Sequence, residues 1–196
     1  MLFRHQAIFV KERVGFLKLT DVYDLLDPST GGQIGQIRDE PSALSKYLRL
    51  VVNKLLLPTR FNVYEGDSGQ PSLSIVKKSI IVRGHLDVEE RGQVLFRLRG
   101  KIFSFRGYYD VLAPHSDQIV AEVRGDWKGW NFKLLNPSGG EVGTITKKWA
   151  GIGKELFTSA DNYMVVLGGE AASFPKPMES LLAVAIALDA VHKERK

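Results

Sequence analysis

The chain of 196 residues contains no cysteine, and this absence excludes several kinds of chemistry. Without thiols there is no disulfide framework, no thiolate zinc site and no cysteine nucleophile. Long hydrophobic runs are also missing, because no stretch approaches the roughly 20 apolar residues that a membrane span needs. The first ten residues, MLFRHQAIFV, lack the apolar core of a signal peptide. We therefore expect a soluble cytoplasmic protein.

The residues that are present have the composition of one globular domain. Hydrophobic residues make up 44% and charged residues 25%, so disorder is not expected, and we predict a single domain over residues 1–196. The 27 basic and 22 acidic residues give a formal net charge of +5. Such an excess attracts anionic lipid, acidic protein or nucleic acid, or simply covers a solvated surface. Nucleic acid is disfavoured as a partner, because none of the usual binding motifs is present.

A repeated segment predicts antiparallel hairpins. Residues 23–37 (YDLLDPSTGGQIGQI) closely match residues 132–145 (FKLLNPSGGEVGTI), and residues 109–120 form a looser third copy. In the first two copies an alternating segment leads into a turn with one proline and two glycines, which reverses the chain before alternation resumes. The repeat indicates a β-meander and carries no chemistry by itself.

About twelve short strands are predicted, which favours closure into a barrel, because closure removes exposed strand edges. A propeller is disfavoured, because the units are two-stranded hairpins and not four-stranded blades. The segments expected to form strands, some of which merge, are 7–11, 15–19, 22–26, 33–38, 60–65, 72–77, 79–89, 93–99, 101–105, 108–113, 118–124, 129–135, 141–146, 154–158 and 162–167.

One departure from the strand pattern lies at residues 42–57, which we predict to form a short amphipathic helix. Ser42 is placed to cap it and Pro58 to end it. A basic amphipathic helix of this kind either lies at a membrane interface or packs on the barrel wall. Its apolar side is expected to hold Leu44, Tyr47, Leu48, Val51, Val52 and Leu55, and its polar side Lys46, Arg49, Asn53 and Lys54.

A second departure is the C-terminal segment, residues 177–196, which is apolar all round from Leu181 to Leu188. A helix of that kind is either buried or membrane-spanning, and a run of eight residues is too short for a bilayer. The four alanines of this segment have small side chains, which would let the helix fit inside a narrow barrel. We therefore expect a helix that lies along the barrel axis and supplies much of the core.

Several segments then point to a known family: residues 23–32, the basic apolar segment 44–58, the repeat at 132–145, and Ala-Asp-Asn-Tyr at 160–163 ahead of the terminal helix. With these the chain resembles the LURP-one-related proteins and phospholipid scramblases of the Tubby C-terminal-like superfamily. The resemblance implies a closed barrel of about twelve antiparallel strands around a buried C-terminal helix. It also implies phosphoinositide binding by basic surface residues, as in Tubby proteins, or calcium binding and lipid movement, as in scramblases.

The chain departs from scramblases at the residues that would bind calcium. Ser159 stands where scramblases have an acidic residue, and Asp161 and Asn162 alone supply few of the six to eight oxygens that calcium prefers. A cysteine-rich palmitoylation segment is missing as well. We expect neither a metal nor a cofactor.

No catalytic constellation emerges from the remaining residues. The four histidines are scattered without metal-ligand spacing, and no G-x-S-x-G nucleophile motif occurs. Glu89 and Glu90 are adjacent, so on a strand they would point to opposite faces. We therefore do not expect an enzyme.

The function expected from these patterns is a non-enzymatic binding or regulatory module that associates with anionic phospholipid at a membrane surface. A protein-interaction or scaffold domain is the alternative, and a small-molecule enzyme or a phospholipid scramblase is more remote. Insertion of Leu44, Leu48 or Leu55 would assist binding. The candidate lipid-binding residues are Lys46, Arg49 and Lys54, with Lys77, Lys78, Lys147 and Lys148 as further candidates.

Overall fold

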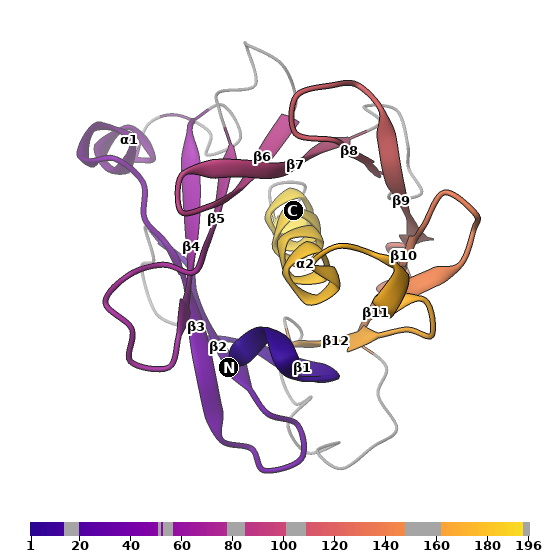
Figure 1. Ribbon diagram of the computed structural model, residues 1–196. Helices are drawn as coiled ribbons and strands as arrows, with labels where there is room; N and C mark the ends of the chain where they lie inside the picture. The colour runs from indigo at the N-terminus through magenta and orange to yellow at the C-terminus, as the bar shows by residue number, and fades with distance from the viewer. Residues whose placement is uncertain are drawn as a thin grey trace.

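A closed antiparallel barrel surrounds the C-terminal helix in the computed structural model, which describes residues 1–13, 20–50, 52, 57–77, 85–100, 109–147 and 162–193 (Figure 1). Twelve strands among these residues each pair with the next along the chain, and β1 pairs with β12 to close the ring. The predicted fold class is confirmed.

The barrel strands are short, and most coincide with predicted segments. They are β1 Ala7–Glu12, β2 Val22–Leu26, β3 Gln33–Asp39, β4 Thr59–Glu65, β5 Leu73–Lys77, β6 His85–Glu90, β7 Gln93–Gly100, β8 Tyr109–Leu112, β9 Ile119–Asp126, β10 Asn131–Leu135, β11 Glu141–Thr146 and β12 Tyr163–Leu167. The helical elements are η1 Leu2–Arg4, α1 Ala43–Leu48, η4 Ala171–Ser173 and α2 Pro177–Lys193. The predicted strands at 15–19, 101–105 and 154–158 lie outside the described residues.

The helix α2 forms the centre of the core, as predicted. Every residue from Leu181 to Leu188 is at most 3% exposed, because inward side chains of the strands surround the helix on all sides. Ala183, Ala185 and Ala187 keep it slim enough for this channel. Neither α2 nor any other described helix has the length and apolar character needed to span a membrane.

Four hairpins carry a β-bulge, and all four bulges lie at the same end of the barrel. The extra residues, which have no partner across the hairpin, are Ile34, Leu95, Val120 and Val142. Ile34 and Val142 occupy the same place in the two closest sequence repeats. A bulge bends its strand and changes the direction of its side chains, so the repeat specifies a bulge as well as a turn.

The helix α1 is shorter than predicted, and it leaves large apolar side chains exposed. Ser42 caps it as expected, since its Oγ accepts a hydrogen bond from the backbone N–H of Ser45 at 3.2 Å. The helix ends at Leu48, however, and not near residue 57. Leu44 and Tyr47 are 71% and 74% exposed, whereas Ser45 is buried. Of the two arrangements that the sequence left open, packing on the barrel wall does not hold for Leu44 and Tyr47.

Candidate functional site

A buried ion pair fixes the α1 segment to the barrel. The Arg49 guanidinium donates from Nη1 to Asp39 Oδ2 at 2.5 Å and from Nη2 to Asp39 Oδ1 at 3.1 Å. Its Nη2 also donates to Thr59 Oγ1 at 3.2 Å. The side chains of Arg49 and Asp39 are 3% and 0% exposed. Because Asp39 ends β3 and Thr59 begins β4, Arg49 ties the connection between these strands to the strands themselves.

Arg49 is predicted on the polar side of the helix as a candidate lipid-binding residue, but in the structure its side chain is buried. Its guanidinium is directed inward because the Asp39 carboxylate compensates its charge there, and the bidentate pair gives both carboxylate oxygens a donor. Arg49 therefore positions α1 and does not present its charge to a ligand.

Beyond this anchor, the α1 segment exposes large apolar side chains beside a cation. Leu44, Tyr47 and Leu50 are 71%, 74% and 67% exposed, and Lys46 is also exposed. Figure 1 shows α1 outside the ring of strands. Scattered exposed hydrophobic residues are ordinary, but a cluster of them marks an interaction surface. Residues 44–50, which we name the α1 tip, form such a cluster.

Two further candidate lysines lie at the same end of the barrel as α1. Lys77 ends β5 opposite Thr59, and Lys147 follows β11. The Lys147 ammonium lies over the Trp130 ring, 4.2 Å from its centroid, in a cation–π contact. The remaining candidates, Lys54, Lys78 and Lys148, lie outside the described residues.

Inside the barrel, at the same end, the core contains a polar cluster. The Tyr23 hydroxyl donates to Asp189 Oδ2 at 2.6 Å, and Tyr163 lies close enough to Asp189 to respond to its charge. All three residues are fully buried. Burial, and after it the Asp189 carboxylate, raises the pKa of both tyrosines well above the ordinary value. Across the described ranges, no three histidine, aspartate or glutamate side chains are grouped as metal ligands.

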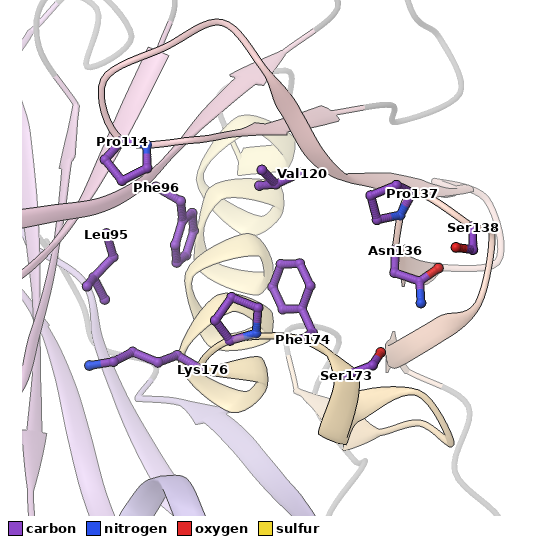
Figure 2. Close-up of a pocket in the computed structure, with 11 residues that line it drawn as sticks. Leu95, Phe96, Pro114, Val120, Asn136, Pro137, Ser138, Ser173, Phe174 and Lys176 are labelled. Carbon is purple, nitrogen blue, oxygen red and sulfur yellow. The ribbon is translucent and has the colours of Figure 1, made fainter.

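The opposite end of the barrel contains a pocket of about 590 Å³ (Figure 2). Its walls come from the start of β7, the start of β9, the β10–β11 turn and the segment between η4 and α2. Leu95, Phe96, Val120 and Phe174 supply much of its apolar surface. Our sequence reasoning missed this pocket, although one signal was available. Three consecutive apolar residues break the alternation at 94–96 and again at 119–121, at the bulges that help to form it.

A barrel of twelve antiparallel strands around a buried C-terminal helix defines the fold class of this protein. A solved structure has a similar fold. The X-ray structure of a protein from Arabidopsis thaliana matches with a TM-score of 0.53 and 12% sequence identity, covering 93% of this chain and 91% of that chain. At this identity the likeness shows the fold alone. No curated protein sequence matches the chain significantly.

The family follows from the sequence match. The family model described as Scramblase matches residues 89–195, which is more than half of the chain. The chain belongs to the Scramblase family, and the predicted scramblase-like and LURP-one-related resemblance is confirmed. Membership indicates a lipid-related binding module and leaves the specific ligand open.

Proposed function

We propose that this protein is a non-enzymatic module that binds anionic phospholipid surfaces peripherally through the α1 tip. The observation that carries the proposal is the exposure of Leu44, Tyr47 and Leu50 beside Lys46 on a segment that Arg49 anchors. Family membership supports a role connected with lipid.

The energetics of the α1 tip suit reversible attachment. Full burial of a leucine-sized side chain contributes about 1.5–3 kcal/mol, and partial insertion contributes less. Tyr47 has an aromatic ring and a hydroxyl, which suits the boundary between hydrocarbon and water. Lys46 adds about 1 kcal/mol near an anionic surface. Because the Arg49–Asp39 pair already orders the segment, binding has a smaller entropic cost.

The charge of the same barrel end would orient the protein toward a membrane. Lys77 and Lys147 lie at this end, and the chain as a whole carries a formal charge of +5. Lys54, Lys78 and Lys148 remain candidates from the sequence. Long-range electrostatic attraction weakens as the salt concentration rises. The proposal therefore requires that membrane binding falls with ionic strength, while the contribution of the inserted apolar side chains remains.

Co-sedimentation with vesicles tests the proposal. Phosphatidylcholine vesicles are compared with vesicles that also contain phosphatidylserine or a phosphoinositide. We expect the protein to bind only the anionic vesicles, the L44E/L50E double variant to lose binding, and K46E to weaken it. R4E is the matched control, because Arg4 is exposed on η1 and undergoes the same charge change away from α1.

Equal binding to neutral and anionic vesicles, or full binding by L44E/L50E, would overturn the proposal. The same exposed side chains would also serve a protein-interaction domain. That alternative is favoured if vesicles are not bound while a purified partner binds the wild-type chain and not L44E/L50E.

A further inference from the structure

We propose that the pocket at the barrel end opposite α1 binds the hydrocarbon chain of a single-chain amphiphile, either a free fatty acid or a monoacyl phospholipid (Figure 2). The proposal does not rest on the function proposed for the α1 tip, because the two sites share no residues and lie at opposite ends of the barrel.

Two β-bulges direct side chains into this pocket. Adjacent residues of a regular strand point to opposite faces of the sheet. Leu95 and Phe96 nevertheless both line the pocket, because Phe96 pairs with Val88 and Val94 with Glu89, which leaves Leu95 as the extra residue.

The second bulge acts in the same way on the neighbouring hairpin. Ala121 pairs with Val111 and Ile119 with Leu112, so Val120 is the extra residue and lines the pocket. Bulges often direct side chains into binding sites. The apolar wall of the pocket is thus set by the pairing registers of these two hairpins.

The segment that enters α2 completes the pocket. Figure 2 shows the Phe96 and Phe174 rings facing the middle of the pocket, with Lys176 at one edge. Lys176 has a left-handed backbone with φ of 50°, an uncommon conformation for a residue with a side chain. Its ammonium is bound by Glu90, so an ion pair holds this wall in place. Backbone strain of this sort is concentrated at functional sites.

The lining chemistry favours a hydrocarbon chain over a peptide. A volume of about 590 Å³ falls within the roughly 300–1,000 Å³ range of ligand pockets. Pro114, Pro137 and Pro175 have no N–H, so these positions cannot donate main-chain hydrogen bonds to an extended peptide. A hydrocarbon chain needs no hydrogen bonds and gains from contact with the apolar wall.

The polar groups suit the head of an amphiphile. Four of the eleven lining residues are polar, namely Asn136, Ser138, Ser173 and Lys176. Asn136 Oδ1 already accepts a hydrogen bond from the Gly140 N–H at 2.7 Å. Asn136 would therefore use its side-chain N–H groups to donate hydrogen bonds to a headgroup. Lys176 is the one cation among the lining residues. The carboxylate of a fatty acid or the phosphate of a monoacyl phospholipid would lie beside this ammonium and share it with Glu90.

Displacement of a fluorescent fatty-acid analogue, below micelle concentrations, tests the proposal. We expect saturable binding of one probe per chain. V120W fills the pocket and should weaken binding by about tenfold or more. I119W is the matched control, because Ile119 is the preceding residue of β9, is 40% exposed and does not line this pocket. Circular dichroism confirms that both variants are folded.

Two competitors, oleate and lysophosphatidylcholine, distinguish the sources of the chain. If oleate displaces the probe, and does so less well from K176Q, the ligand is a fatty acid. If lysophosphatidylcholine displaces the probe more strongly than oleate, the ligand is a monoacyl phospholipid. Absence of saturable binding, or equal binding by V120W and the wild-type chain, would overturn the proposal. L44E/L50E should bind the probe normally, so failure of the membrane proposal remains distinguishable from failure of this one.

Discussion

At the scale of single residues, the Arg49–Asp39 pair has the clearest structural role. Both side chains are essentially buried, and such pairs contribute little net stability because removing two charges from water is costly. They do impose geometry, since the two hydrogen bonds between Arg49 and Asp39 form in one orientation of the two side chains. Asp39 thereby determines where the α1 tip leaves the barrel, although it lies before the helix in the chain.

Replacing Asp39 by alanine should destabilise the protein markedly. D39A removes the carboxylate that compensates the buried Arg49 guanidinium, which costs about 3–5 kcal/mol, to be measured by urea unfolding. D67A is the control, because Asp67 is exposed in the β4–β5 turn, and its effect should stay within about 0.5 kcal/mol. The double variant D39L/R49M should recover most of the loss. Equal stability of D39A and D67A would contradict this role.

At the scale of elements, the glycine after each repeated bulge permits close packing. A Cβ on Gly35 would lie 2.5 Å from the Tyr64 carbonyl oxygen, and one on Gly143 would lie 2.5 Å from the Val166 carbonyl oxygen. Backbone atoms cannot move aside as a flexible side chain can. At Gly143 the added carbon would also overlap Leu181 of α2, so this glycine determines how closely the central helix approaches β11.

The variant G143A should therefore cost about 1–3 kcal/mol of unfolding free energy, the usual cost of overpacking. G69A is the matched control, because a Cβ on Gly69 would meet nothing within 4 Å. Thermal unfolding of both variants checks the expectation. A melting temperature for G143A equal to that of G69A would show that the helix and the Val166 backbone both make room without cost, and would contradict the expectation.

The elements also show how far the sequence could predict the fold. Alternation and the repeated turns predicted the hairpins, because both are local signals. The extent of α1 could not be predicted in this way. The helical spacing of apolar residues continues past Leu48, although the helix ends there. Arg49, the next residue, pairs with Asp39, and the spacing of apolar residues contains no information about such a contact. Three of the seven candidate basic residues lie outside the described residues, so their place in a site stays a prediction.

At the scale of the whole molecule, the two ends of the barrel have different chemistry. One end has the α1 tip and, within the core, the polar cluster around Asp189. The other has the four bulges and the apolar pocket. Because α2 fills the barrel between them, a ligand cannot pass along the axis. Membrane contact at one end and chain binding at the other would therefore be separate events that can occur together.

The buried tyrosines give the whole molecule a pH limit. Burial, and after it the Asp189 charge, raises the pKa of Tyr23 and Tyr163 above the ordinary value of 10.0. Above pH 10 the unfolded chain loses protons that the folded chain retains. Stability falls with pH wherever the unfolded state binds fewer protons, so the contribution of these tyrosines is fully present below pH 10 and is lost above it.

We therefore expect the barrel to unfold at alkaline pH, with tyrosinate absorbance from the buried rings appearing together with the loss of circular dichroism. Y163F removes one of the two linked protons and should make stability decline less steeply with pH. Tyr163 is the better position to change, because Tyr23 donates a hydrogen bond to Asp189 that phenylalanine would remove. Ionisation of both rings near pH 10 with the barrel intact would show that water reaches the polar cluster, and α2 would then not seal this end.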